Sequence, residues 1–208
     1  MWRKSKFYQN RKSHLPVLRE IKQTMTLTVP IVKGITDYAA LAKAIAKLGT
    51  NPKHTLMTLA MPEDDAIAYE FLETLADCFG SLKRVIVTNT EGSPTDKSNR
   101  FLRAAIDAYL PTDSKYPMLY FDPQQRPIAL HWLDVLQSNY FHCATPEVFG
   151  KFVSGKPIGS ILFNMKYFQT STLLNFIPPS VHWRGWLSAE MNRRNEASAE
   201  SILRNLIA

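Results

Sequence analysis

Strand-like apolar runs alternate with amphipathic stretches along most of this chain, and that alternation limits the folds it can adopt. The apolar runs, rich in β-branched and aromatic residues, cover residues 24–32, 54–61, 82–90 and 117–122. Strands separated by helices of this length are typical of parallel βαβ units. We therefore expect an α/β fold, a three-layer sandwich around a mainly parallel central sheet.

Helical periodicity and turn residues predict the elements between and after these strands. Asp37 is expected to cap a helix that ends at Gly49, Gly80 to end the next helix, and Ser98 to cap the one after it. The expected helices cover residues 37–49, 63–79, 98–110 and about 131–141, followed by a strand at 159–168 and a polar helix at 187–208.

Composition is that of a packed globular chain. The 208 residues are 45% hydrophobic, and we expect an N-terminal arm at 1–22, an α/β domain at 23–184 and a helical extension at 185–208. No apolar run is long enough to cross a bilayer, and no apolar segment of a secretory signal follows the basic N-terminus. We expect Cys78 and Cys143 to be buried thiols of a cytoplasmic protein, in the host cytoplasm or a virion if a phage encodes it.

The net charge of +7 belongs almost entirely to the N-terminal arm, because residues 1–22 hold seven Lys and Arg against Glu20. Trp2, Phe7 and Tyr8 are interleaved with these cations. Such a segment suits phosphate contacts with aromatic stacking, docking into an acidic groove of a protein partner, or a solvated chain end. The arm thus predicts a protein or nucleic-acid partner, with an oligomer or larger assembly as a further expectation.

Several catalytic classes lack their motifs. The chain has no GxSxG, HExxH, GxGxxG or GxxxxGK[ST] sequence and no CxxC spacing. Asp64 and Asp65 open a predicted helix, where acids favour the positive end of the dipole, so we interpret them as helix-start residues.

Two regions remain as candidates for a site. Asp122 ends the strand at 117–122, and ligands of α/β proteins bind at the carboxyl ends of strands. The segment 91–103 follows another strand and runs into a helix. There Asn99, Arg100 and Arg103 offer hydrogen-bond donors for a phosphate or a sugar.

Together these regions resemble type-A glycosyltransferases, the nucleotide-diphospho-sugar transferase fold, in particular small members encoded by bacteria and phages. The resemblance covers about residues 24–142. It rests on an N-terminal Val-Pro strand, a helix with Asn99 and Arg103, an aromatic strand ending in acid-Pro, and a following Trp-Leu-Asp helix. The matching positions are Asn99, Arg103, Tyr120, Asp122, Pro123, Pro127, Trp132, Leu133 and Asp134.

The resemblance implies a carboxylate pair that holds Mn²⁺ or Mg²⁺ on the diphosphate of a nucleotide sugar. Asp122 stands at the first position of this motif as catalytic residue and metal ligand, but Gln124 stands at the second. An amide lowers the charge of the site by one, which weakens divalent-metal binding. The neighbouring Arg126 either binds the diphosphate directly or prevents metal binding, and His182 is the candidate for the late base or ligand.

Two functions follow from these expectations. In the first, the domain binds a nucleotide sugar through Asn99, Arg100, Arg103, Gln124 and Arg126, with impaired or lost metal-dependent catalysis by a degenerate glycosyltransferase site. In the second, it is a non-catalytic structural or interaction protein, such as a phage virion or assembly component, that docks through its basic arm.

Overall fold

The computed structural model describes residues 25–88, 91–109, 116–142, 148–153, 156–165 and 181–187, together with residue 207. The predicted arm at 1–22, Cys143 and most of the predicted C-terminal helix lie outside these described residues. Within them, no helix is both long and apolar enough to span a membrane.

Six strands form one sheet in the order β3-β2-β1-β4-β6-β5. Parallel pairs join β1 to β2 and β4, and β2 to β3, whereas β6 is antiparallel to both β4 and β5. The strands are β1 Thr26–Ile31, β2 Asn51–Ala60, β3 Phe79–Ile86, β4 Pro117–Tyr120, β5 Val148–Val153 and β6 Lys156–Asn164.

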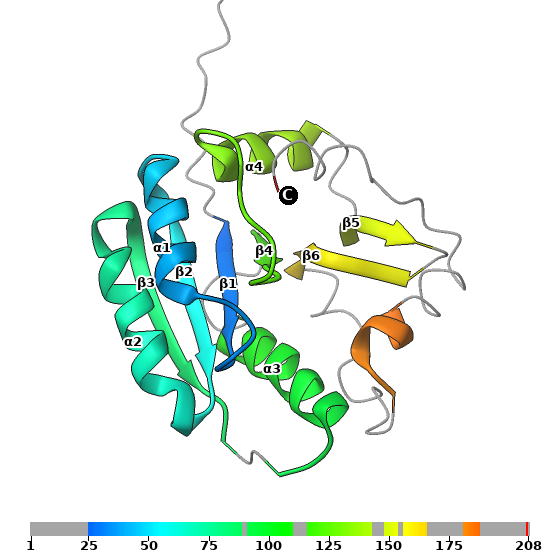
Figure 1. Ribbon diagram of the computed structural model, residues 1–208. Coiled ribbons are helices and arrows are strands. Elements are labelled where there is room, and N and C mark those ends of the chain that lie inside the picture. Colours follow the sequence, from blue (N-terminus) through cyan, green and yellow to red (C-terminus); the bar gives the residue numbers. More distant parts are fainter. Residues whose placement is uncertain are drawn as a thin grey trace, which may run out of the picture.

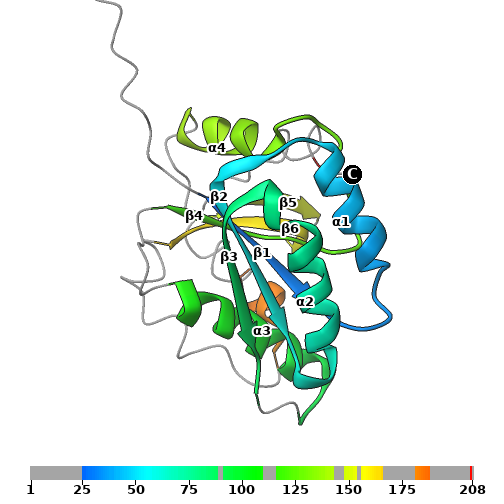
Figure 2. The same ribbon diagram turned by 90° about the vertical axis from the view of Figure 1, so that its left-hand side faces the viewer.

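Helices cover both faces of this sheet, which confirms the predicted three-layer α/β fold. Helices α1 and α2 lie on one face and α3 on the other (Figures 1 and 2). The helices are α1 Tyr38–Lys47, α2 Asp65–Thr74, α3 Pro94–Tyr109 and α4 Trp132–His142, with 3₁₀ turns η1 at Pro62–Asp64 and η2 at Ala76–Cys78.

Successive side chains of the strands point to opposite faces of the sheet, where they pack into two separate apolar cores. From β1, Leu27 and Val29 enter the core shared with α1, α2 and α4, while Met57 and Leu59 of β2 enter the core shared with α3. β4 lies between β1 and β6 and is buried at every position, as expected for a central strand of a sheet covered on both faces.

Two of the predicted helix boundaries are wrong. The helix predicted at 63–79 ends at Thr74, and Gly80 lies within β3. A Cβ on Gly80 would lie 2.0 Å from the carbonyl oxygen of Pro52, so this glycine permits close approach of two backbones instead of ending a helix.

The predicted cap of α3 is also displaced. The helix begins at Pro94, and Ser93 caps it together with Asp96. The Ser93 N–H donates to Asp96 Oδ2 at 2.9 Å, and the Asp96 N–H donates to Ser93 Oγ at 3.2 Å. Hydrogen bonds from Ser93 hold the pKa of the Asp96 carboxyl below its usual value. Ser98, the predicted cap, lies inside the helix, and its hydroxyl accepts a hydrogen bond from the Trp183 indole.

Strand β5 went unpredicted. It is six residues long and contains Gly150, and within the described part of the chain its one partner is β6, with a register irregularity after Gly150. Of the two predicted buried thiols, Cys78 is buried and free.

His54 connects the sheet to α4 at the end opposite the carboxyl ends of β1 and β4. Its ring is buried, its Nδ1 accepts a hydrogen bond from the Met25 N–H at 3.2 Å, and its Nε2 lies 3.1 Å from Asp134 Oδ1. Burial lowers the pKa of His54, with Asp134 acting in the opposite direction. The folded protein therefore holds a neutral ring with its proton on Nε2.

We expect the free energy of unfolding to fall as the pH drops below about 6.5, because the unfolded chain then binds a proton at position 54 that the folded chain excludes. Urea unfolding between about pH 7.5 and pH 5.5 measures this slope. His54→Gln should make this slope shallower without abolishing it, because burial also lowers the pKa of His182. His131→Asn, which replaces an exposed ring, is the matched control. Equal slopes in the wild type and H54Q would contradict the assignment.

Candidate functional site

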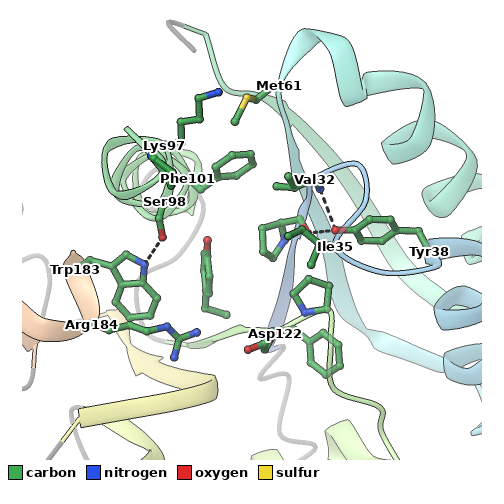
Figure 3. A pocket seen from close by; sticks show the side chains of 15 residues that line it. Val32, Ile35, Tyr38, Met61, Lys97, Ser98, Phe101, Asp122, Trp183 and Arg184 are labelled. Carbon is green, nitrogen blue, oxygen red and sulfur yellow. Dashed lines mark hydrogen bonds between the residues drawn. The ribbon is translucent and has the colours of Figure 1, made fainter. Parts of the chain in front are cut away.

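A pocket of about 310 Å³ opens where the carboxyl ends of β1 and β4 separate. Strand order reverses between these two strands, and ligands of open α/β sheets bind at such a point. The lining combines apolar walls with two cations and one carboxylate. It consists of Pro30, Val32, Ile35, Tyr38, Met61, Pro94, Lys97, Ser98, Phe101, Tyr120, Phe121, Asp122, Pro123, Trp183 and Arg184 (Figure 3).

The Val-Pro end of β1 forms one wall of the pocket. The last paired residues of β1 and β4 are Thr28 and Tyr120, so Pro30 lies beyond this ladder and its missing N–H removes no bond from it. The Tyr38 hydroxyl accepts from the Val32 N–H at 2.9 Å and donates to the Pro30 carbonyl at 3.1 Å. Burial raises the pKa of Tyr38 to about 12, so this hydroxyl keeps its proton and fixes the wall.

Asp122 begins a tight turn just after β4. Its carbonyl accepts from the Gln125 N–H at 2.9 Å, and its Oδ1 accepts from the Gln124 N–H at 3.0 Å. Its own N–H donates to Ser160 Oγ on β6 at 2.9 Å. These bonds hold the Asp122 carboxylate at the pocket, where the sequence placed it.

The two glutamines after Asp122 do not line the pocket. Gln124 is exposed. Gln125 Oε1 accepts from both the N–H and the hydroxyl of Ser160, at 2.6 and 2.7 Å. A Cβ on Gly159 would come within 2.7 Å of the Gln125 amide, so glycine there leaves room for this contact. Gln125 therefore attaches the turn to β6.

Arg126, predicted to bind the diphosphate, is used within the same loop. Its Nη1 donates to the carbonyls of Pro123 and Gln125 at 2.9 and 3.0 Å, and its Nη2 donates to Thr36 Oγ1 at 3.0 Å. It is absent from the pocket lining. The geometry thus gives its guanidinium a positioning role between two loops.

Helix α3 forms the opposite wall of the pocket and binds the segment 181–187. Lys97, Ser98 and Phe101 line the pocket. Asn99 Nδ2 donates to the Val181 carbonyl at 2.9 Å, and Asn99 Oδ1 accepts from the Trp183 N–H at 2.8 Å. Asn99, predicted to contact the ligand, instead fixes the segment 181–187 against α3.

The other two predicted donors of α3, Arg100 and Arg103, lie outside the pocket lining. Both engage in interactions with other groups of the protein. Their assignment to a diphosphate remains a prediction.

The segment 181–187 closes the third side through Trp183, which is 1% exposed. Its Nε1–H donates to Ser98 Oγ at 3.0 Å, and its ring packs against Tyr120 and Phe163 at centroid distances of 5.6 and 6.1 Å. Ser98 is thus an acceptor for an indole rather than a helix cap. Because Trp183 is held from α3, β4 and β6 together, the residue after it enters the pocket at a defined place.

That residue, Arg184, was not among the predicted site residues. Its guanidinium carbon lies 4.5 Å from the centroid of the Trp183 ring, and its side chain extends toward Asp122 (Figure 3). Burial lowers the pKa of Arg184, and the Asp122 charge acts against that shift. The one available signal was an arginine between two tryptophans, HWRGW.

His182 is beside the pocket but not in its lining. Its ring stacks on Trp183, and its Nδ1 accepts from the Arg184 N–H at 3.2 Å. Burial, followed by the charge of Arg184, lowers its pKa. The neutral ring then carries its proton on Nε2 and offers a donor there, not a base.

The residues present do not fit the divalent cation that the fold implies. Among the described residues, no group of three or more His, Cys, Asp and Glu side chains could hold a metal ion. Within the pocket lining Asp122 is the one acid, and a guanidinium faces it. A hard cation requires several oxygen ligands and is repelled by a neighbouring positive charge.

No family model and no curated protein sequence matches the chain. Solved structures do share its fold. The mannosyltransferase PcManGT from Pyrobaculum calidifontis, in complex with GDP-Man and Mn²⁺, superposes with a TM-score of 0.58 at 12% identity, over 84% of this chain and 53% of that one.

Two further structures agree on the architecture. The glycosyltransferase GlyE of Streptococcus pneumoniae, in its apo form, gives a TM-score of 0.52 at 11% identity, over 85% of this chain and 44% of its own. The 4-diphosphocytidyl-2C-methyl-D-erythritol synthase of Anaerococcus prevotii gives 0.53 at 7% identity, over 85% and 86%. The chain thus spans about half the length of the two glycosyltransferases. At these low identities the superpositions establish the fold alone, which is the type-A nucleotide-diphospho-sugar transferase fold.

The attachment of Trp183 to α3 predicts a measurable coupling. Ser98→Ala leaves a buried indole N–H without an acceptor and should lower the free energy of unfolding by about 1–3 kcal/mol. In the Trp183→Phe background the same substitution should cost much less, because the donor is gone. Urea unfolding of the wild type, S98A, W183F and the double variant gives the coupling energy between the two side chains. Ser81→Ala, at an exposed position of β3, is the control. Additive losses would show that the contact is absent.

Proposed function

We propose that this chain, which has the type-A nucleotide-diphospho-sugar transferase fold, binds a nucleotide sugar in the pocket between β1 and β4 and transfers the sugar to an acceptor hydroxyl. One observation carries the proposal. At the switch point of the sheet, a single pocket combines apolar walls with Lys97, Asp122 and Arg184.

The lining suits the parts of such a donor. Its volume of about 310 Å³ lies at the lower end of the range for small-molecule sites, about 300–1,000 Å³. The apolar side chains Val32, Ile35 and Phe101 offer surfaces for a base and ribose. The two cations match a diphosphate, and the Asp122 carboxylate can accept hydrogen bonds from sugar hydroxyls.

The proposed reaction needs little from the protein beyond positioning and charge. The bond between the anomeric carbon and the diphosphate oxygen breaks, the acceptor oxygen bonds to that carbon, and the acceptor proton passes to a base or to solvent. Negative charge grows on the leaving diphosphate, where Lys97 and Arg184 stabilise it electrostatically. We expect catalysis that does not depend on a divalent metal, because the described residues of the lining include one acid, Asp122.

Isothermal titration calorimetry with UDP-, GDP-, CDP- and dTDP-sugars tests donor binding. At least one should bind, and Lys97→Met should weaken that donor about tenfold, as expected for one charge-assisted contact. Lys53→Met is the matched control, since Lys53 is an exposed lysine near the start of β2. Absence of heat from every donor, with and without Mn²⁺, would contradict the function.

A second function rests on the charge of the chain. Residues 1–22 hold seven of its 25 Lys and Arg and one acid. We propose that this segment binds a polyanionic partner, either a nucleic acid or an acidic protein surface, independently of the pocket.

Deletion of residues 1–22 tests this second function. The truncated chain should keep the thermal stability of residues 25–187 but lose binding to a single-stranded oligonucleotide, measured by fluorescence anisotropy. The affinity of the full chain should fall as salt rises, through the counterions released from phosphates. Unchanged binding after deletion would show that the arm is not the site.

A further inference from the structure

The geometry points to Arg184 as the residue that replaces the divalent cation beside Asp122, so that the pocket binds the diphosphate of its ligand directly and without metal. This inference rests on the proposed function for the identity of the ligand. The central claim is that Arg184 forms a diphosphate site that still binds in EDTA. This claim can be tested without knowing which nucleotide sugar binds.

Arg184 is placed by a platform and does not depend on the ligand for its position. Its guanidinium stacks on the Trp183 ring, 4.5 Å from the centroid. Trp183 is itself fixed by Ser98 Oγ, Asn99 Oδ1 and the rings of Tyr120 and Phe163. An arginine held in this way loses less side-chain entropy when it binds an anion, and its planar fork suits phosphate oxygens.

The charges of the pocket favour an anion over a cation. Among the described residues of the lining, Lys97 and Arg184 stand against Asp122, a surplus of one positive charge. Burial lowers the pKa of Arg184, but a guanidinium is not deprotonated in proteins at neutral pH, so Arg184 carries its positive charge. A second positive charge next to it is repelled, whereas a diphosphate is attracted to both cations.

The other arginine near Asp122 does not compete for this role. Arg126 is bound to two loop carbonyls and to Thr36 Oγ1, and it is absent from the lining. Arg184 instead extends into the pocket toward Asp122 (Figure 3). Of these two arginines, Arg184 is the one that lines the pocket.

This arrangement changes the role of the carboxylate. In a metal site Asp122 would be a ligand, and its removal would abolish diphosphate binding. Beside Arg184 it is an anion that competes with the diphosphate for the guanidinium and that accepts from sugar hydroxyls. Its removal should then affect the diphosphate and the sugar in opposite directions.

The experiment titrates the full-length protein with inorganic pyrophosphate and with the nucleoside diphosphates UDP, GDP and CDP, in EDTA and in Mn²⁺. We expect pyrophosphate to bind equally well in both. Arg184→Met should weaken it at least tenfold, and Arg184→Lys should restore part of the loss. Arg84→Met is the matched control, because Arg84 also lies over an aromatic ring, that of Tyr69, on exposed β3.

Asp122→Asn distinguishes a metal site from an anion site built on Arg184, and it leaves the Trp183 ring that supports Arg184 unchanged. We expect it to tighten pyrophosphate binding in EDTA, and to weaken a nucleotide sugar relative to its parent nucleoside diphosphate. Thermal unfolding of each variant checks that it is folded. If R184M does not fold, the affinity of R184K for pyrophosphate, compared with that of the wild type, tests the inference instead.

The outcomes separate this inference from the proposed function. Nucleotide-sugar binding that needs Mn²⁺ and is lost in D122N would overturn the role of Arg184 while the function stands. Pyrophosphate binding in EDTA that depends on Arg184, without binding of any nucleotide sugar, would support the anion site and remove the function. Failure of pyrophosphate and all nucleotides to bind in EDTA overturns the inference.

Discussion

The hydrogen-bonded ladder between β1 and β4 ends at Thr28 and Tyr120, and the pocket depends on this ending. Beyond it Pro30 offers no donor that could continue the ladder, and Asp122 turns the other strand away toward β6. Hydrogen bonds hold both edges of this opening in place. The Tyr38 hydroxyl holds one edge, and the bonds from the Asp122 turn to Ser160 hold the other.

Aromatic packing then determines what enters this opening. Burial of a tryptophan such as Trp183 is worth about 3–5 kcal/mol by truncation to alanine, more than any single surface ion pair supplies. That contact anchors the segment 181–187, which in turn carries Arg184 to the pocket. Lys97 comes from α3 itself, whereas the charge of Arg184 reaches the site as a consequence of an apolar contact beside it. Asp122 offsets part of the cost of burying that charge.

Much of the fold could be predicted because its causes are local. Alternating apolar runs marked β1, β2, β3 and β4, and Asp37 marked the start of α1, where its Oδ1 accepts from the Ala40 N–H at 2.9 Å. The errors arose where a partner overrode the local signal. Gly80 is a glycine because Pro52 approaches it, and Ser98 is a serine facing an indole.

What the sequence determined by itself was the strand–helix order, the Val-Pro end of β1 and a carboxylate at the end of β4, since these follow from short-range periodicity and strand direction. Tertiary structure decided which polar side chains reach the pocket. Gln125 and Arg126 stand next to Asp122 in the chain but are bound to Ser160 and to loop carbonyls. Arg184 is remote in sequence yet faces Asp122, because long-range packing of Trp183 on β4, β6 and α3 brings it there.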